Sequence, residues 1–212
     1  TLGGAEPAAE LTDVERAVRL YYAVRDGLRY EVYGADLSRN GMRASSIIER
    51  GFGFCIHKSV VYAAATRAAG VPSRIVLGDV RNHLASPRLR ELVGGDLFRF
   101  HSLTQVYLNG KWVKATPVFN KNLCRLYRIA PLEFDGSADS VYHPYDEDGR
   151  KHMEFVHWHG EFPDFPYEMV INGIREGHPK LFESSVTTTG GSLADESAQQ
   201  RSLLARSSTD AS

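Results

Sequence analysis

Apolar residues near the start of the chain recur at helical spacing. They occupy Val14, Ala17, Val18, Tyr21, Val24 and Leu28. Thr12, followed three residues later by Glu15, is the sequence signature of a capping box, in which each side chain bonds the backbone N–H of the other residue. The spacing therefore predicts an amphipathic helix from residue 12 to about residue 27.

Two further helices are predicted on either side of a glycine-rich turn. Ser46 and Glu49 make a second capping box, and Gly51 is expected to end that short helix. Residues 56–69 are rich in Ala and Val on every side and are followed by Gly70. A helix that is apolar all round is buried, so this one is predicted to lie at the centre of the fold.

The pattern then changes to one typical of strands, which are predicted at residues 73–80, 100–108 and 111–115. Asn109-Gly110 between the last two runs indicates a tight hairpin. The connection 82–97 is expected to be a long loop, of the kind that forms the lid or rim of a site. Residues 132–134 and 153–158 are predicted to be half-buried, with strand and helix both left open.

The chain reads as one main domain, residues 1–183, followed by a polar tail. Residues 184–212 are mainly Ser, Thr, Gly, Ala and Gln. Such a composition buries too little apolar surface to offset the entropy of ordering, so the tail is predicted to be disordered.

Composition and charge exclude several classes of function. The 25 basic and 26 acidic residues of the 212-residue chain give a net charge of -1 and form no run of one sign, so nucleic-acid binding is not expected. No apolar stretch approaches the roughly 20 residues of a membrane span. Only Cys55 and Cys124 are present, which favours a reducing compartment over a disulfide scaffold, and a cytoplasmic location is expected.

Cys55 is the first candidate for chemistry. It ends the turn Gly51-Phe-Gly53-Phe-Cys55 and is predicted to stand at a helix N-terminus. Free N–H groups and the helix dipole favour a thiolate there and can also hold an oxyanion. A buried packing cysteine is the alternative, but two glycines before the thiol favour a nucleophile that needs room for substrate. Cys124 has no such turn and is interpreted as a bystander.

Several histidines are candidates for a partner of this thiol or for a metal site. His57 lies two positions along the predicted helix, so it faces away from Cys55 and is expected to be a surface or packing residue. His101, at the start of a predicted strand, is the better candidate for a base. His152, His157 and His159 resemble a metal site only loosely, because no Cys pair or helical His-Glu motif accompanies them. They are expected to line a cleft or pack with Trp158, and neither a metal nor a cofactor is expected.

Three blocks of sequence carry a resemblance to a known family. They are residues 53–55, residues 66–74, and His101 followed by residues 106–113. In this order they resemble the transglutaminase-like superfamily, over about residues 15–120. The resemblance implies an α+β, papain-like fold, with the nucleophile helix packed on an antiparallel β-sheet. It also implies that Cys55 is the nucleophile and His101 its base, in a catalytic domain formed by residues 1–183.

The third catalytic position departs from the family pattern. The family has an acid, commonly Asp before Pro, where this chain has Thr116-Pro117. A threonine hydroxyl can accept from the imidazole N–H and fix its tautomer, but it supplies no charge. Asn120 and Asp135 remain alternatives to Thr116.

The resemblance thus implies acyl transfer from a peptide, or a small amide or thioester, through a covalent acyl-enzyme. Hydrolysis or a protease-like activity is the first expectation, and transfer to an amine is the second. A non-catalytic binding or scaffold module that retained the fold is the alternative, because Thr116 replaces the acid.

Overall fold

The computed structural model describes residues 11–83, 85–142, 145–183 and 191–196. Helix α1 (Asp13–Gly27) begins where the pattern predicted. Thr12 N donates to Glu15 Oε2 over 2.8 Å, and Glu15 N donates to Thr12 Oγ1 over 3.2 Å, so the capping box is confirmed. Helix α2 (Ala44–Arg50) ends at left-handed Gly51 as expected, but it starts after Arg43, and the predicted Ser46 cap is wrong.

The main sheet has four strands in the order β5-β4-β3-β6, and all neighbours are antiparallel. Their bounds are β3 (Ser73–Asn82), β4 (Leu97–Leu108), β5 (Lys111–Ala115) and β6 (Met153–Phe162). Asn109 and Gly110 both have positive φ, 50° and 82°, as a two-residue hairpin turn with matching twist requires. The predicted strands and hairpin are therefore confirmed, and the open segment 153–158 is a strand.

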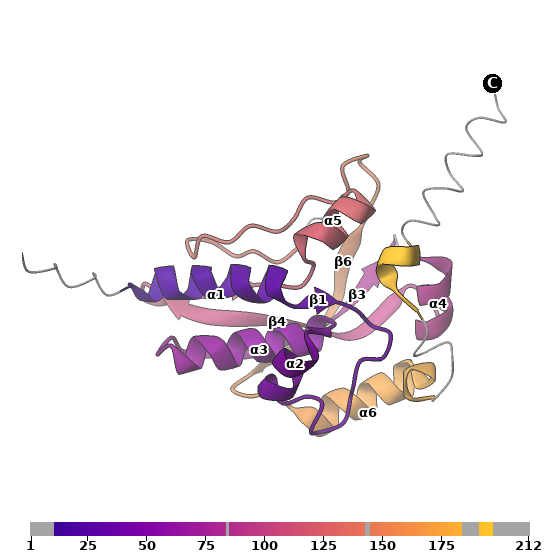
Figure 1. The fold of residues 1–212 in the computed structure, drawn as a ribbon, viewed down its shortest axis with the longest axis horizontal. Coiled ribbons are helices and arrows are strands. Elements are labelled where there is room, and N and C mark those ends of the chain that lie inside the picture. Colours follow the sequence, from indigo (N-terminus) through magenta and orange to yellow (C-terminus); the bar gives the residue numbers. More distant parts are fainter. Residues whose placement is uncertain (1–10, 84, 143–144, 184–190, 197–212) are drawn as a thin grey trace, which may run out of the picture.

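Helix α3 (Cys55–Ala68) packs against β3 and β4 and runs beside α1, which lies on the same side of the sheet in Figure 1. Two apolar clusters fill the core, and the partly buried Val60 of α3 packs against both. Buried residues lie around most of this helix, because the helix has α1 and α2 on one side and the sheet on the other. The central helix and the α+β class are confirmed.

The connection 82–97 is not the long loop that was predicted. It contains helix α4 (Pro87–Val93), which begins after Ser86, whose Oγ accepts from Leu89 N over 3.0 Å. Three further elements escaped prediction: α5 (Lys121–Tyr127), α6 (Tyr167–Gly177) and the 3₁₀ turn η1 (Pro179–Phe182). A short two-stranded parallel sheet, β1 (Arg29–Tyr30) with β2 (Phe52–Gly53), completes the fold.

Part of the predicted tail is packed on the domain. Residues 184–190 and 197–212 lie outside the described residues. The intervening residues 191–196 do not follow the prediction, because Leu193 and Glu196 are buried and residues 193–196 form a helical turn. Among the described segments, no helix is both long and apolar enough to cross a membrane.

Candidate active site

The turn that carries Cys55 is fixed by the small parallel sheet. Tyr30 pairs with Gly53, and Glu31 N donates to Gly53 O over 3.1 Å. Phe54 is extended, and its carbonyl accepts from Lys58 N, so α3 begins at Cys55. The thiol therefore lies at a helix N-terminus, as predicted.

Gly53 serves packing, not the substrate space that its type suggested. A Cβ on Gly53 would lie 2.6 Å from His57 Cβ, so a glycine is needed here to leave room for the His57 side chain. His57 is fully buried, its Nε2 lies 3.0 Å from Asp36 O, and its ring packs edge-on against Phe54. Burial lowers the pKa of His57 to about 4. His57 is a packing residue, as expected.

Cys55 and His101 line the same cavity of about 70 Å³, which has room for several water molecules. Cys55 starts α3, and His101 lies on β4 opposite Gly78 of β3. The backbone N–H of Ser102, directly after His101, faces the Cys55 sulfur. Two residues 46 positions apart in the sequence are thus brought to one cavity by the packing of α3 on β4.

Both groups are neutral at rest. Burial raises the pKa of Cys55 to about 11, and the backbone N–H groups of Ser102, Ile56 and Cys55 lower it by less. Burial lowers the pKa of His101 to about 4. The prediction that the helix N-terminus yields a thiolate is wrong for this structure, because the thiol is withdrawn from water and desolvation disfavours its charge.

Thr116 lies near the histidine without bonding to it. It lines a second, smaller cavity together with His101. Its buried Oγ1 has no hydrogen-bond partner among the described residues, while its carbonyl accepts from the Tyr21 hydroxyl over 3.2 Å. The hydrogen bond expected from His101 is not formed here, and the catalytic role of Thr116 stays a prediction.

The other two candidates for the third position are committed elsewhere. Asn120 Oδ1 accepts from Tyr30 N over 3.1 Å, which ties α5 to the strand beside the nucleophile. Asp135 is exposed and accepts from both Ser137 N and Ser137 Oγ. Among the described residues, Thr116 lines the smaller of the two cavities that His101 lines, and Asn120 and Asp135 line neither of these two.

His157 and His159 lie on β6, and His152 directly precedes that strand. No cluster of three or more His, Cys, Asp or Glu with metal-binding geometry occurs in the described part of the chain. His152 lines both cavities beside His101, as the cleft-wall interpretation expected. His159 instead bonds Asp79, with its Nε2 2.6 Å from Oδ1.

Two further residues at the site have no signal in the sequence pattern. Tyr30 lines the cavity, and burial raises the pKa of its phenol well above the usual range, with a further rise from the nearby Cys55. Phe100, directly before His101, has a left-handed backbone with φ of 56°. Its N–H donates to Asp79 Oδ1 over 3.0 Å, and its ring stacks on His159. Such strain in a bulky residue is maintained only by surrounding contacts.

Comparison with known proteins gives one family and distant structures. The family model described as the transglutaminase-like superfamily matches residues 5–117, over half of the chain. Nine solved chains match. One of them, "a Putative Cysteine Protease from Cytophaga hutchinsonii", is 15% identical with a TM-score of 0.39. The match covers 69% of this chain and 53% of that one, so the chain spans about half the length of that structure. No curated protein matches significantly.

Proposed function

This chain belongs to the transglutaminase-like superfamily, and from that premise we propose that it is a thiol enzyme that transfers acyl groups from a peptide, or a small amide or thioester. Cys55 is the nucleophile and His101 the base. The observation that carries the proposal is the one cavity that both side chains line, with the Ser102 N–H facing the sulfur.

The proposed reaction starts from a neutral Cys55 thiol and a neutral His101 imidazole. As the Cys55 sulfur attacks the carbonyl carbon, His101 accepts the thiol proton, so no free thiolate has to form in the mostly apolar cavity. N–H groups at the start of α3 are available to the oxyanion. His101 then gives the proton to the leaving nitrogen, and a thioester forms. Water, activated by His101, attacks the thioester, which releases the acid and restores the thiol.

Hydrolysis is the first proposal because the cavity of about 70 Å³ has room for water molecules. Transfer to an amine shares every step up to the thioester, and only the acceptor differs. The walls around the thiol are mostly apolar and aromatic, with Tyr30, Phe54 and Phe119 among them. Such walls suit a peptide or an amide with an apolar side chain.

A second candidate is a non-catalytic binding module of the same fold. Two observations favour it: the Thr116 hydroxyl makes no hydrogen bond, and burial raises the pKa of Cys55 to about 11. A cysteine in such a module would be a packing residue. The rate at which Cys55 is alkylated would then not depend on His101.

Alkylation by iodoacetamide between pH 6 and 10, read by mass spectrometry, tests the proposal. Wild type is compared with His101→Gln, and melting curves of both proteins check that the fold is intact. An enzyme requires that loss of His101 slows the modification of Cys55 at pH 7. Equal Cys55 rates in the two proteins would establish the binding module instead.

A further inference from the structure

Residues 191–196 cover the cavity that contains the candidate nucleophile. Leu193 is 3% exposed and lines this cavity together with Cys55 and His101. In Figure 1 the segment is the yellow turn beside α4. It lies far along the chain from α3 and β4, and Leu193 belongs to the same apolar cluster as Phe54 and Cys55.

Side chains of the domain bond both backbone groups of Leu193. Its N–H donates to Glu31 Oε2 over 3.2 Å, and its carbonyl accepts from the Tyr127 hydroxyl over 3.2 Å. Glu31 is itself buried and fixed, because its other carboxylate oxygen accepts from the N–H groups of Val32 and Tyr33. The domain thus bonds the backbone N–H and carbonyl of Leu193 and also encloses its side chain in a pocket. Peptide-binding clefts hold a residue of a bound peptide in the same way.

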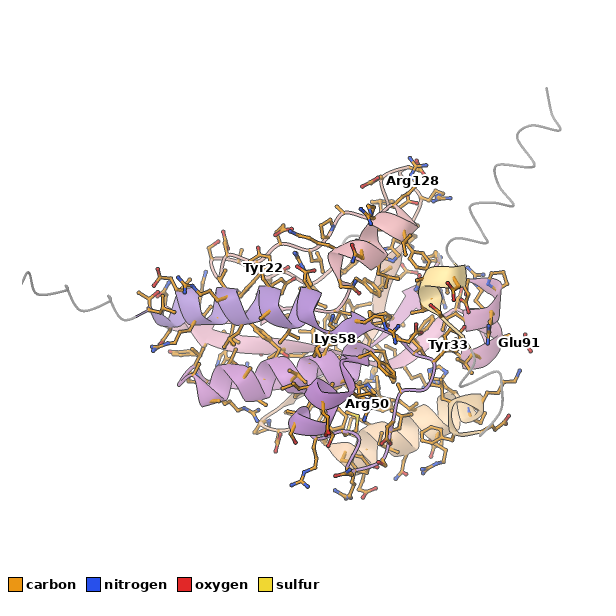
Figure 2. All side chains as sticks on the ribbon, in the orientation of Figure 1. Tyr22, Tyr33, Arg50, Lys58, Glu91 and Arg128 are labelled. Atoms are coloured by element: carbon orange, nitrogen blue, oxygen red, sulfur yellow. The ribbon has the colours of Figure 1, made fainter. Side chains whose placement is uncertain are left out.

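A second anchor lies three residues further on. The Glu196 carboxylate accepts from the Tyr33 hydroxyl and from Ser86 Oγ, both over 2.5 Å, and Arg88 Nε lies 3.6 Å away. The labelled Tyr33 in Figure 2 marks this side of the molecule. Between the anchors, Ala194 and Asp195 are exposed. The contacts therefore select an apolar residue followed, three positions later, by an acidic residue.

The N-terminal end of the segment requires glycine. A Cβ on Gly191 would lie 2.6 Å from Cγ of the Tyr33 ring, so the backbone packs directly on the aromatic face. Three separate features thus fix this segment: a glycine on a ring, a buried leucine and a bonded carboxylate.

We propose that residues 191–196 occupy in cis a peptide-binding cleft above Cys55, and that the cleft recognises peptides of the form Gly-x-Leu-x-x-Glu. The segment must leave before another peptide can enter, so it acts as a competitive inhibitor tethered to the enzyme. The binding stands on the contacts alone, whereas the inhibition rests on the proposed function.

The first test uses the full chain with Leu193→Asp, Glu196→Gln and the control Asp195→Asn, which changes a neighbouring exposed carboxylate. The readout is the iodoacetamide rate of Cys55 at pH 8. We expect both cleft variants to be modified about tenfold faster, the change that the loss of about 1.4 kcal/mol of binding gives, while Asp195→Asn and the Cys124 rates match wild type. An unchanged Cys55 rate in both variants would show that the segment does not cover the thiol.

The second test adds the acetylated and amidated peptide Gly-Ser-Leu-Ala-Asp-Glu, the sequence of residues 191–196, to the Leu193→Asp protein. We expect it to slow Cys55 alkylation again, and the same peptide with aspartate for leucine to have no effect. If Cys55 and Cys124 both react faster in the variant and the peptide protects neither, the segment is a structural part of the core and the proposal is overturned. Protection of Cys55 without any dependence of its rate on His101 would refute the enzyme and leave the peptide cleft standing.

Discussion

The two cysteines of this chain look alike by burial and differ in what faces their sulfur atoms. Both are buried, and burial raises the pKa of each thiol to about 11. His101 lines the cavity of Cys55 and also the smaller cavity of Cys124, so each thiol shares a cavity with this histidine. Neither pKa nor proximity to His101 therefore separates a nucleophile from a bystander.

The two cysteines differ in the backbone groups that face their sulfur atoms. Cys55 begins α3, and N–H groups, including that of Ser102, point toward its sulfur. Cys124 lies inside α5, and its Sγ donates to Phe119 O over 3.7 Å. N–H donors stabilise a developing anion, whereas a carbonyl stabilises the protonated thiol. Burial raises the pKa of both thiols; the N–H groups of Ser102, Ile56 and Cys55 oppose that rise at Cys55, whereas Arg25 is the first of the groups that oppose it at Cys124.

The largest effect that tests this comparison is expected from replacing each cysteine. Cys55→Ala should abolish turnover of any peptide or amide that wild type cleaves, because no other group can form the thioester. Cys124→Ala should retain turnover. Steady-state assays with melting curves for both variants measure this, and undiminished turnover by Cys55→Ala would end the proposal of a thiol enzyme.

Replacement of the shared histidine is expected to have the next largest effect. His101→Ala should lower kcat/KM by roughly 10² to 10⁴, the usual contribution of a positioned base. Single-turnover acylation measures the step directly. A loss below about threefold, with the fold intact, would place the proton acceptor elsewhere.

The next prediction concerns Lys58, which is near enough to Cys124 for each group to influence the pKa of the other. Its Nζ donates to Arg25 O and Leu28 O, 2.8 and 2.7 Å away, at the end of α1, and Figure 2 shows it between α1 and α3. Lys58→Met leaves these carbonyls unpaired, which should cost about 1 to 3 kcal/mol of unfolding free energy. Denaturant titrations of both proteins measure the loss.

The pH dependence sharpens this test. Burial lowers the pKa of Lys58 from 10.5 to about 7, with Asp26 opposing that shift. Between these values the unfolded chain binds more protons, so the contribution of Lys58 to stability is present above pH 10.5 and lost as pH falls toward 7. Lys58→Met should flatten this slope of stability against pH. A slope equal to that of wild type would contradict the shift.

The smallest effect is expected at the third catalytic position. Thr116→Ala should lower kcat/KM by about tenfold or less, because a neutral hydroxyl contributes only about 0.5 to 1.5 kcal/mol even when bonded. Asn120→Ala and Asp135→Ala, assayed on the same substrate, are the comparisons. A loss in either as large as that of His101→Ala would move the third member away from Thr116.

The sequence by itself determined the features that depend on neighbours along the chain. The Thr12 capping box, the apolar pattern of α3, the Asn109-Gly110 turn and the glycines before Cys55 are local signals, and each led to the observed element. The resemblance to the transglutaminase-like superfamily predicts that Cys55 and His101 act as a pair; both line one cavity, and their catalytic pairing stays a prediction.

Only the tertiary structure decided what depends on distant contacts. Phe100 is left-handed because Asp79 and His159 hold it, and the thiol pKa is raised because the surrounding core excludes water. Residues 191–196 are too polar to order themselves, yet Glu31 and Tyr33 bind them across some 160 positions of sequence. Local composition measures what a segment can bury alone, whereas such a segment is ordered by partners that composition does not reveal.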